Sequence, residues 1–129
     1  MTIRILMVDD EPDAQELFRQ NFRREVRKGI YDFEFAESGE QALDILRDGT
    51  PPEILLVLSD VNMPGMSGME LLEQVRKIWP DVGVFMITAY GDAATESRAK
   101  ALGASNFFAK PIDFPRLKDD LARATGAAG

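Results

Sequence analysis

Short apolar runs alternate with longer amphipathic segments along almost the whole chain of 129 residues, and no other sequence feature constrains the fold as strongly. The apolar runs predict five strands, at residues 3–8, around Phe33 and Phe35, and at 54–59, 84–88 and 105–109. Helical periodicity predicts five helices, over residues 13–28, 39–47, 68–78, 93–102 and from 114 onward. Strands that alternate with helices pair in parallel through right-handed crossovers, which place helices on both faces. The sequence therefore predicts an α/β domain with a doubly wound five-stranded parallel sheet.

Capping residues and apolar stripes define the predicted helices. The capping signatures are Ser38 with Gln41, Ser67 with Glu70, Asp92 and Asp113. The stripes that we expect to be buried are Leu17, Phe18, Phe22 and Val26 in the first helix, and Phe114, Leu117, Leu121 and Ala124 in the last.

Histidine and cysteine are both absent from the chain. Their absence excludes disulfides, thiolate and imidazole metal sites, and catalysis by a cysteine or a histidine triad. The 22 acidic residues outnumber the 15 lysines and arginines, and the net charge of −7 disfavours direct binding of nucleic acid. The longest apolar run, residues 54–58, is too short to cross a bilayer, which needs about 20 residues. Because Met1-Thr2-Ile3-Arg4 leads straight into the first strand, we expect no signal peptide and a cytoplasmic protein.

Chemically versatile side chains stand at the carboxyl ends of the predicted strands, where open parallel sheets bind their ligands. Asp9 and Asp10 follow the first strand, Asp60 closes the third, Thr88 closes the fourth and Lys110 follows the fifth. Each of these residues alone has an ordinary structural interpretation, such as helix capping or a solvated charge. Their convergence at one edge of one sheet favours a functional site.

Three carboxylates in one crevice would repel each other, and a divalent cation removes that repulsion. An all-oxygen ligand set favours Mg²⁺ over Zn²⁺. The loop after Asp60 is irregular enough for the Asn62 carbonyl to face the metal. A carboxylate left free beside Mg²⁺ can attack phosphorus, while Lys110 neutralises a phosphoryl oxygen and Thr88 donates to another. The Lys110–Pro111 bond is either cis, turning the lysine into the crevice, or an ordinary strand end.

A basic cluster lies late in the first predicted helix and consists of Arg19, Arg23, Arg24, Arg27 and Lys28. Cations suit the carboxyl end of a helix and a solvated outer face. The alternative is a docking role for an acidic partner.

Four motifs closely resemble the receiver domain of bacterial two-component response regulators. They are Val8-Asp-Asp-Glu-Pro12, Ser59-Asp-Val-Asn-Met-Pro-Gly-Met-Ser-Gly68, Ile87-Thr-Ala89 and Ala109-Lys-Pro111. The resemblance implies a flavodoxin-like strand order 2-1-3-4-5. It also implies a receiver domain over residues 1–125, followed by a tail or the start of a linker at 126–129.

By position, the resemblance implies that Asp60 is the phosphoacceptor, Asp10 a direct Mg²⁺ ligand and Asp9 a water-mediated one. The backbone carbonyl of Asn62 would be a third protein ligand. Thr88 would supply the phosphate-sensing hydroxyl, and Lys110 would be the lysine that the family carries at this site. Phe107 would be the switch aromatic.

The family's partners are a sensor histidine kinase or a histidine phosphotransfer protein, and a downstream protein or output domain. The resemblance implies no enzymatic activity beyond self-catalysed phosphorylation and dephosphorylation, and homodimerisation on activation is possible. We expect phosphorylation to move Thr88 toward the phosphoryl group and to rotate Phe107 into the vacated space. The output surface would be the helix ending near Leu102, the strand at 105–109 and the last helix.

The sequence departs from the family's commonest pattern at three places. Phe107 stands where tyrosine is frequent, and Tyr90 is bulky beside the site and could lengthen the phosphorylated lifetime. The first helix with its loop through Gly29-Ile-Tyr31 is somewhat long.

Three rival interpretations remain. A Mg²⁺ phosphohydrolase would often carry an Asp-x-Asp pair and a cap insertion, whereas Asp9 and Asp10 are adjacent here. A flavodoxin-like flavin carrier would need a phosphate loop after the first strand, where this chain has acids. A degenerate receiver used only as an interaction module would not need to retain all five polar residues at the strand ends, which are Asp9, Asp10, Asp60, Thr88 and Lys110.

Overall fold

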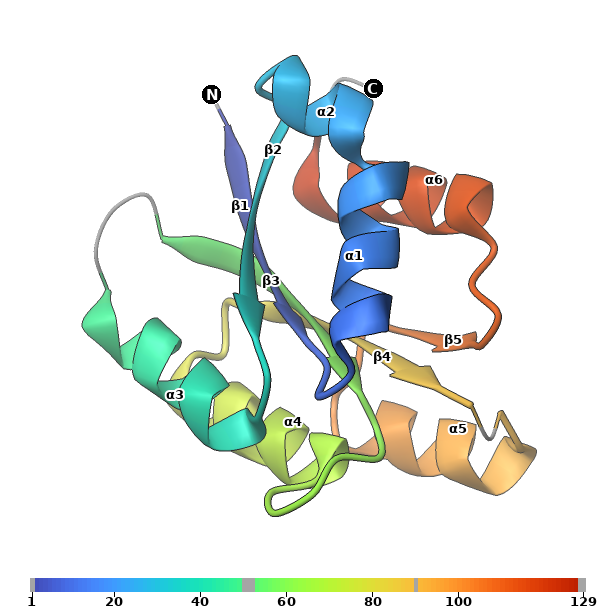
Figure 1. The fold of residues 1–129 in the computed structure, drawn as a ribbon. Coiled ribbons are helices and arrows are strands. Elements are labelled where there is room, and N and C mark those ends of the chain that lie inside the picture. Colours follow the sequence, from blue (N-terminus) through green and yellow to red (C-terminus); the bar gives the residue numbers. More distant parts are fainter. Residues whose placement is uncertain (1, 50–52, 90, 128–129) are drawn as a thin grey trace.

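The computed structural model describes residues 2–49, 53–89 and 91–127. They form a five-stranded sheet in the order β2-β1-β3-β4-β5, in which every neighbouring pair is parallel (Figure 1). The strands are β1 (Ile3–Val8), β2 (Tyr31–Ala36), β3 (Ile54–Asp60), β4 (Gly83–Thr88) and β5 (Asn106–Ala109). The predicted doubly wound α/β fold and its strand order are therefore confirmed.

Helices cover both faces of the sheet, as Figure 1 shows. One face carries α1 (Pro12–Asn21), α2 (Arg23–Arg27) and α6 (Phe114–Thr125). The other carries α3 (Gly39–Asp48), α4 (Gly68–Ile78) and α5 (Ala93–Ala101). Across the described residues, none of the helices combines the length and the apolar character that crossing a bilayer requires.

Two hydrophobic cores lie on the two faces of the sheet, because successive strand side chains point to opposite sides. In β3, Leu56 and Leu58 enter the core beneath α1 and α6, whereas Val57 enters the core beneath α3 and α4. Both faces are covered, which explains why β3 is apolar almost throughout. Only the carboxyl end of the strand turns polar, at Ser59 and Asp60.

The single helix predicted over residues 13–28 is wrong, because the structure divides it at Phe22 into α1 and α2. Phe22 has φ −105° and ψ 11°, outside the α-helical range. Its ring is fully buried, 5.6 Å from Phe18 and 4.8 Å from Phe33 between ring centroids. The change of direction at this anchored ring leaves α2 without a buried residue.

The predicted apolar stripes are only partly buried. Leu17 and Val26 are 47% and 45% exposed, and Ala124 is also exposed. Phe18, Leu117 and Leu121 are buried as expected. Val26 follows the break at Phe22, so a helical repeat continued through that break assigns Val26 to the wrong face. Leu17 lies before the break and lines a surface pocket.

The predicted helix caps are present. Asp92 and Asp113 accept hydrogen bonds from the backbone of their helices, and Ser67 forms a complete capping box with Glu70. At α3, Ser38 accepts a bond from the Gln41 backbone N–H, but the Gln41 side chain accepts from Glu37 rather than from Ser38. The cap therefore holds the end of β2 as well as the start of α3.

Candidate functional site

The predicted acidic cluster forms at the carboxyl edge of the sheet. The register between β1 and β3 pairs Val8 with Ser59, so Asp9 and Asp60 follow side by side. Carboxylate oxygens of Asp9, Asp10 and Asp60 lie within 4.8 Å of one another. Asp9 and Asp60 are buried, and Asp10 is the most open to solvent. Three oxygen donors this close, from adjacent strand ends, fit the ligand preferences of Mg²⁺.

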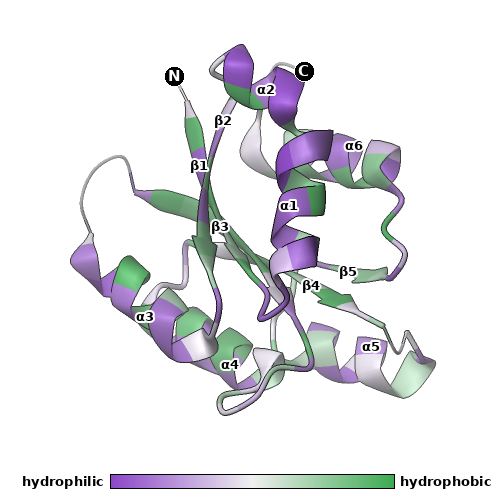
Figure 2. Ribbon diagram, viewed as in Figure 1, coloured by the Kyte–Doolittle hydropathy of each residue, from purple (hydrophilic) through white to green (hydrophobic). Residues whose placement is uncertain are grey.

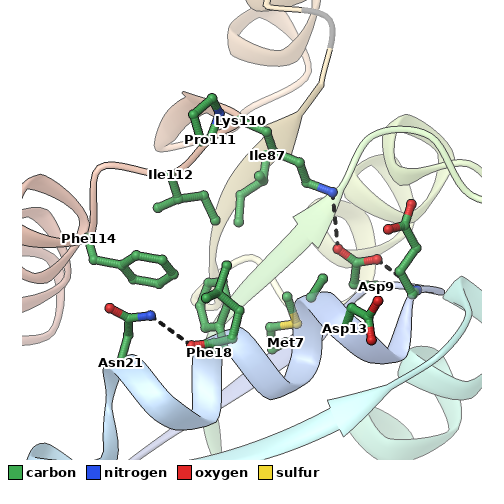
Figure 3. Close-up of a pocket in the computed structure, with 13 residues that line it drawn as sticks. Met7, Asp9, Asp13, Phe18, Asn21, Ile87, Lys110, Pro111, Ile112 and Phe114 are labelled. Carbon is green, nitrogen blue, oxygen red and sulfur yellow. Dashed lines mark hydrogen bonds and ion pairs between the residues drawn. The ribbon is translucent and has the colours of Figure 1, made fainter.

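Lys110 supplies the positive charge opposite these acids. Its ammonium nitrogen lies 2.9 Å from Oδ2 of Asp60 and 3.4 Å from Oδ2 of Asp9, and Figure 3 shows it pointing toward Asp9. Burial alone would lower the pKa of Lys110, but its bonds to Asp60 and Asp9 and their charges raise it above 10.5. The lysine is therefore a full cation in the site. The Lys110–Pro111 peptide bond is cis, which is one of the two arrangements expected.

Asp9 is held in one orientation by its neighbours. Its Oδ1 accepts a hydrogen bond of 2.9 Å from the Glu11 backbone N–H. Burial raises the pKa of Asp9 above 3.8, and the charge of Asp60 adds to this, while the Glu11 N–H and Lys110 oppose it. Burial thus outweighs the stabilisation that the Glu11 N–H and Lys110 give to the Asp9 carboxylate. A cation bound beside Asp9 would favour its charged form.

The loop after Asp60 is fixed by two short backbone bonds. The N–H of Val61 donates to Ile87 of β4, and the N–H of Gly68 donates back to Val61. The Asn62 N–H lies 3.2 Å from Oδ1 of Asp60, so both oxygens of this carboxylate have a donor. The loop therefore fixes the orientation of the Asp60 carboxylate.

Two further residues support this edge: Gly68, which closes the motif after Asp60, and Gln15, which the sequence did not single out. A Cβ at Gly68 would lie 2.7 Å from Cα of Val61 and even closer to the Asp60 carbonyl oxygen, so only glycine allows α4 to start here. The buried Gln15 donates from α1 to the carbonyl of Asp9 at 3.1 Å and contacts that of Ala36. Gly68 follows a helix cap, which is a weak signal, and nothing in the local pattern marks Gln15.

Thr88 and Phe107 lie on the neighbouring strands. Thr88 is fully buried at the end of β4, and its carbonyl accepts a bond of 2.8 Å from the Lys110 N–H. Phe107 of β5 pairs in register with Met86 and is only 7% exposed, in the core beneath α3, α4 and α5. In this structure the Phe107 ring is therefore already buried in the core, before any of the expected rotation. Tyr90 lies outside the described residues.

A pocket of about 490 Å³ adjoins the acidic site, between α1 and the connection from β5 to α6 (Figure 3). Asp9 and Lys110 form its polar end. Leu17, Phe18 and Phe114 are among the apolar residues that line the rest. A reacting group at the site would thus have an apolar surface beside it.

A model of the response regulator receiver domain matches residues 5–122. The chain belongs to this family. The receiver domain is 38% identical to sporulation initiation phosphotransferase F of Bacillus subtilis, over 95% of its own length and 94% of the relative's. It is 34% identical to the response regulator protein PilR of Pseudomonas aeruginosa over 94% of its length, but spans only 26% of that protein. It spans 49% of the Mycobacterium response regulator MprA.

Solved receiver domains share the fold. A receiver domain protein of Clostridium thermocellum superposes with a TM-score of 0.85 at 26% identity, covering 96% of this chain and 94% of that one. The response regulator TrrA of Thermotoga maritima, solved in complex with Mg²⁺ and BeF, gives a TM-score of 0.78 at 33% identity. That match covers 95% of this receiver domain and 98% of TrrA. This chain is thus a receiver domain of two-component signalling, a family of phosphorylation switches.

Proposed function

We propose that Asp60 is the phosphoacceptor of this receiver domain and that its phosphorylation is the signalling event. One observation carries the assignment: the Asp60 carboxylate closes β3 within 4.8 Å of the Asp9 and Asp10 oxygens and 2.9 Å from the Lys110 ammonium. A nucleophilic carboxylate beside a cation-binding pair of acids and a lysine has the parts needed for phosphoryl transfer.

The donor set supports Mg²⁺ as the cofactor. Asp10 would be its direct ligand, Asp9 would bind through water, and the Asp60 carboxylate and the backbone carbonyl of Asn62 would complete the protein ligands. The bound ion would neutralise the charge that gathers on the phosphoryl oxygens. The crystallised Mg²⁺–BeF complex of TrrA supports this choice.

The residues of the chain then have defined tasks. An Asp60 oxygen forms the new O–P bond in line with the P–N bond of a phosphohistidine, which breaks and leaves its electron pair on the imidazole nitrogen. Lys110 exchanges its contact with Asp60 for one with a phosphoryl oxygen, and the Thr88 hydroxyl donates to another. The reaction stops at the aspartyl phosphate until water hydrolyses it, so the chain catalyses only its own phosphorylation and dephosphorylation.

The phosphodonor is a histidine outside this receiver domain, because its 129 residues include no histidine. A sensor histidine kinase or a histidine phosphotransfer protein in the cytoplasm fits this requirement. The match along nearly all of a sporulation phosphotransferase supports a role in a phosphorelay, whereas PilR and MprA extend well beyond the matched part. We place the receiver domain at residues 1–125, with 126–129 as a tail or linker.

The signal leaves through the surface of α5, β5 and α6, to a downstream protein, an output domain or a second copy of the chain. Phosphorylation replaces the single carboxylate charge of Asp60 with a phosphoryl group that carries up to two negative charges. Thr88 would move toward them, and the position of the Phe107 ring would shift with it. The only buried residue of α5 is Ala99, so this helix can repack at low cost.

Intact mass after incubation with Mg²⁺ and acetyl phosphate tests the proposal. We expect one added phosphoryl group on the wild type and none on Asp60→Asn or in the presence of chelator. The matched control is Asp13→Asn, which removes an exposed carboxylate that lines the adjacent pocket but is no member of the acidic cluster. Phosphorylation of Asp60→Asn would overturn the assignment, and many turnovers of a phosphate ester would indicate a hydrolase instead.

A further inference from the structure

A second groove lies on the far side of α1, away from the acidic site. Its volume is about 400 Å³, and we name it the β2-edge groove. It is lined by Arg19, Arg23, Val26, Arg27, Asp32, Phe33 and Phe35. It shares none of these residues with the pocket beside Asp9 and Lys110.

The floor of the β2-edge groove is aromatic and firmly anchored. The rings of Phe33 and Phe35 stack with centroids 6.2 Å apart, and Phe33 rests 4.8 Å from the fully buried Phe22. Both rings are only partly buried, and Val26 beside them is 45% exposed. The structure thus holds apolar surface in place at the edge of the sheet without covering it, which is typical of a binding surface.

The rim of the groove is basic. The Arg19 guanidinium lies 4.3 Å from the centroid of Phe35 and 3.7 Å from the exposed Glu16 carboxylate. Arg23 and Arg27 form no ion pair with any of the described residues, and Asp32 is the single acid of the lining. Three arginines thus gather on a chain whose net charge is −7. Figure 2 shows α2 as a mainly hydrophilic segment.

The groove also borders a free sheet edge. Within the part of the chain that the structure describes, β2 is the first strand of the order β2-β1-β3-β4-β5 and pairs only with β1. One row of its backbone groups therefore has no partner strand and can align an extended chain.

We propose that the β2-edge groove binds an extended acidic segment of a partner protein, with an apolar side chain of that segment on Phe33 and Phe35 and its carboxylates on the arginines. Charge complementarity selects this occupant, and guanidinium groups bind carboxylates through paired hydrogen bonds. The proposal develops the docking role that the basic cluster suggests, and it assigns that role to Arg19, Arg23 and Arg27 rather than to Arg24 and Lys28, which lie outside the groove.

A second copy of the chain fits less well. Pairing of two β2 edges about a twofold axis would bring two arginine rims together, and their like charges would repel. A long nucleic acid would meet the field of the remaining acidic surface.

Fluorescence anisotropy with a short labelled peptide tests the proposal. The probe has a central phenylalanine flanked by glutamates, and the protein is unphosphorylated and free of metal, so the result is independent of the function proposed for Asp60. We expect saturable binding that weakens as salt is added, about tenfold weaker binding to Arg23→Glu/Arg27→Glu, and no binding of a peptide with lysines in place of the glutamates.

The matched control is Arg24→Glu/Lys28→Glu, which makes the same charge change on and beside α2 but outside the groove. It should bind the probe within about twofold of the wild type. Amide shifts in β2 and α1 during the titration would locate the peptide, and Phe35→Ala, checked for folding by circular dichroism, should weaken binding.

Three outcomes would overturn the proposal. The first is that the control variant loses as much affinity for the peptide as the groove variant. The second is that the amide shifts fall outside β2 and α1. The third is that the peptide does not bind and sedimentation shows a dimer that Arg23→Glu/Arg27→Glu abolishes. A second copy of the chain would then be the occupant of the groove.

Discussion

The ammonium nitrogen of Lys110 and Oδ2 of Asp60 lie 2.9 Å apart, although the two residues are 50 positions apart in the chain. Lys110 also reaches Asp9, so one cation stands against two buried carboxylates. This arrangement explains how the site stays folded before a metal or a phosphoryl group arrives. It also means that lysine and metal share the task of neutralising the same oxygens.

Lys110→Met should therefore destabilise the metal-free protein by about 1–2 kcal/mol, because it leaves the clustered carboxylates uncompensated. Saturating Mg²⁺ should restore more stability to the variant than it adds to the wild type. Urea unfolding in chelator and in Mg²⁺ measures both effects. Lys118→Met, which breaks a pair with Glu25 at 3.0 Å, is the control and should respond to Mg²⁺ as the wild type does. An equal response of the two variants would contradict the prediction.

The raised pKa of Asp9 predicts a defined pH dependence. The folded chain binds a proton at Asp9 more readily than the unfolded chain, whose value is near 3.8. The stability contributed by this group therefore falls as the pH rises from about 3.8 through the raised pKa, and it is constant above. In chelator, Asp9→Asn should be more stable than the wild type near neutral pH, since the amide can still accept from Glu11.

This difference in unfolding free energy should shrink as the pH falls through the raised pKa of Asp9 toward 3.8, because Asp9 then becomes protonated in the folded protein. Denaturant titrations of both proteins over that range measure it. A difference that stays constant with pH would show that Asp9 does not titrate in this way.

Gly68→Ala should disrupt the loop that orients Asp60. The new Cβ would press on the Val61 Cα and the Asp60 carbonyl, which are backbone atoms and cannot swing away. We expect a loss of about 1–3 kcal/mol in stability and slower phosphoryl uptake from acetyl phosphate. Gly83→Ala is the comparison, because its Cβ would meet a side chain at 3.5 Å, an ordinary contact. Equal behaviour of the two variants would rule out a special role for Gly68.

Hydrogen exchange tests the proposed output surface. With Mg²⁺ and beryllofluoride, amides of α5 and β5 should change their exchange rates several-fold, because only Ala99 anchors α5 in the core. Amides of α3 should not change, since Ala42, Leu43 and Leu46 hold that helix in place. Unchanged exchange in α5 and β5 would refute the switch.

Local patterns sufficed where the physics is local. The all-apolar run of β3, the polar residues that end it and the caps at Ser67, Asp92 and Asp113 are each set by neighbours a few positions away. The predicted helical periodicity failed at Phe22, because burial of its ring against Phe33 of β2 overrode the helical repeat.

The sequence by itself determined the alternation of strands and helices, the placement of Asp9, Asp10, Asp60, Thr88 and Lys110 at strand ends, and the chemistry those side chains allow. Only the tertiary structure decided how close the carboxylates come, that Gly68 touches the Asp60 backbone, and that three arginines frame an aromatic floor at the β2 edge. The reason is that distances between strands depend on register and on the packing of distant residues, which no short stretch of sequence encodes.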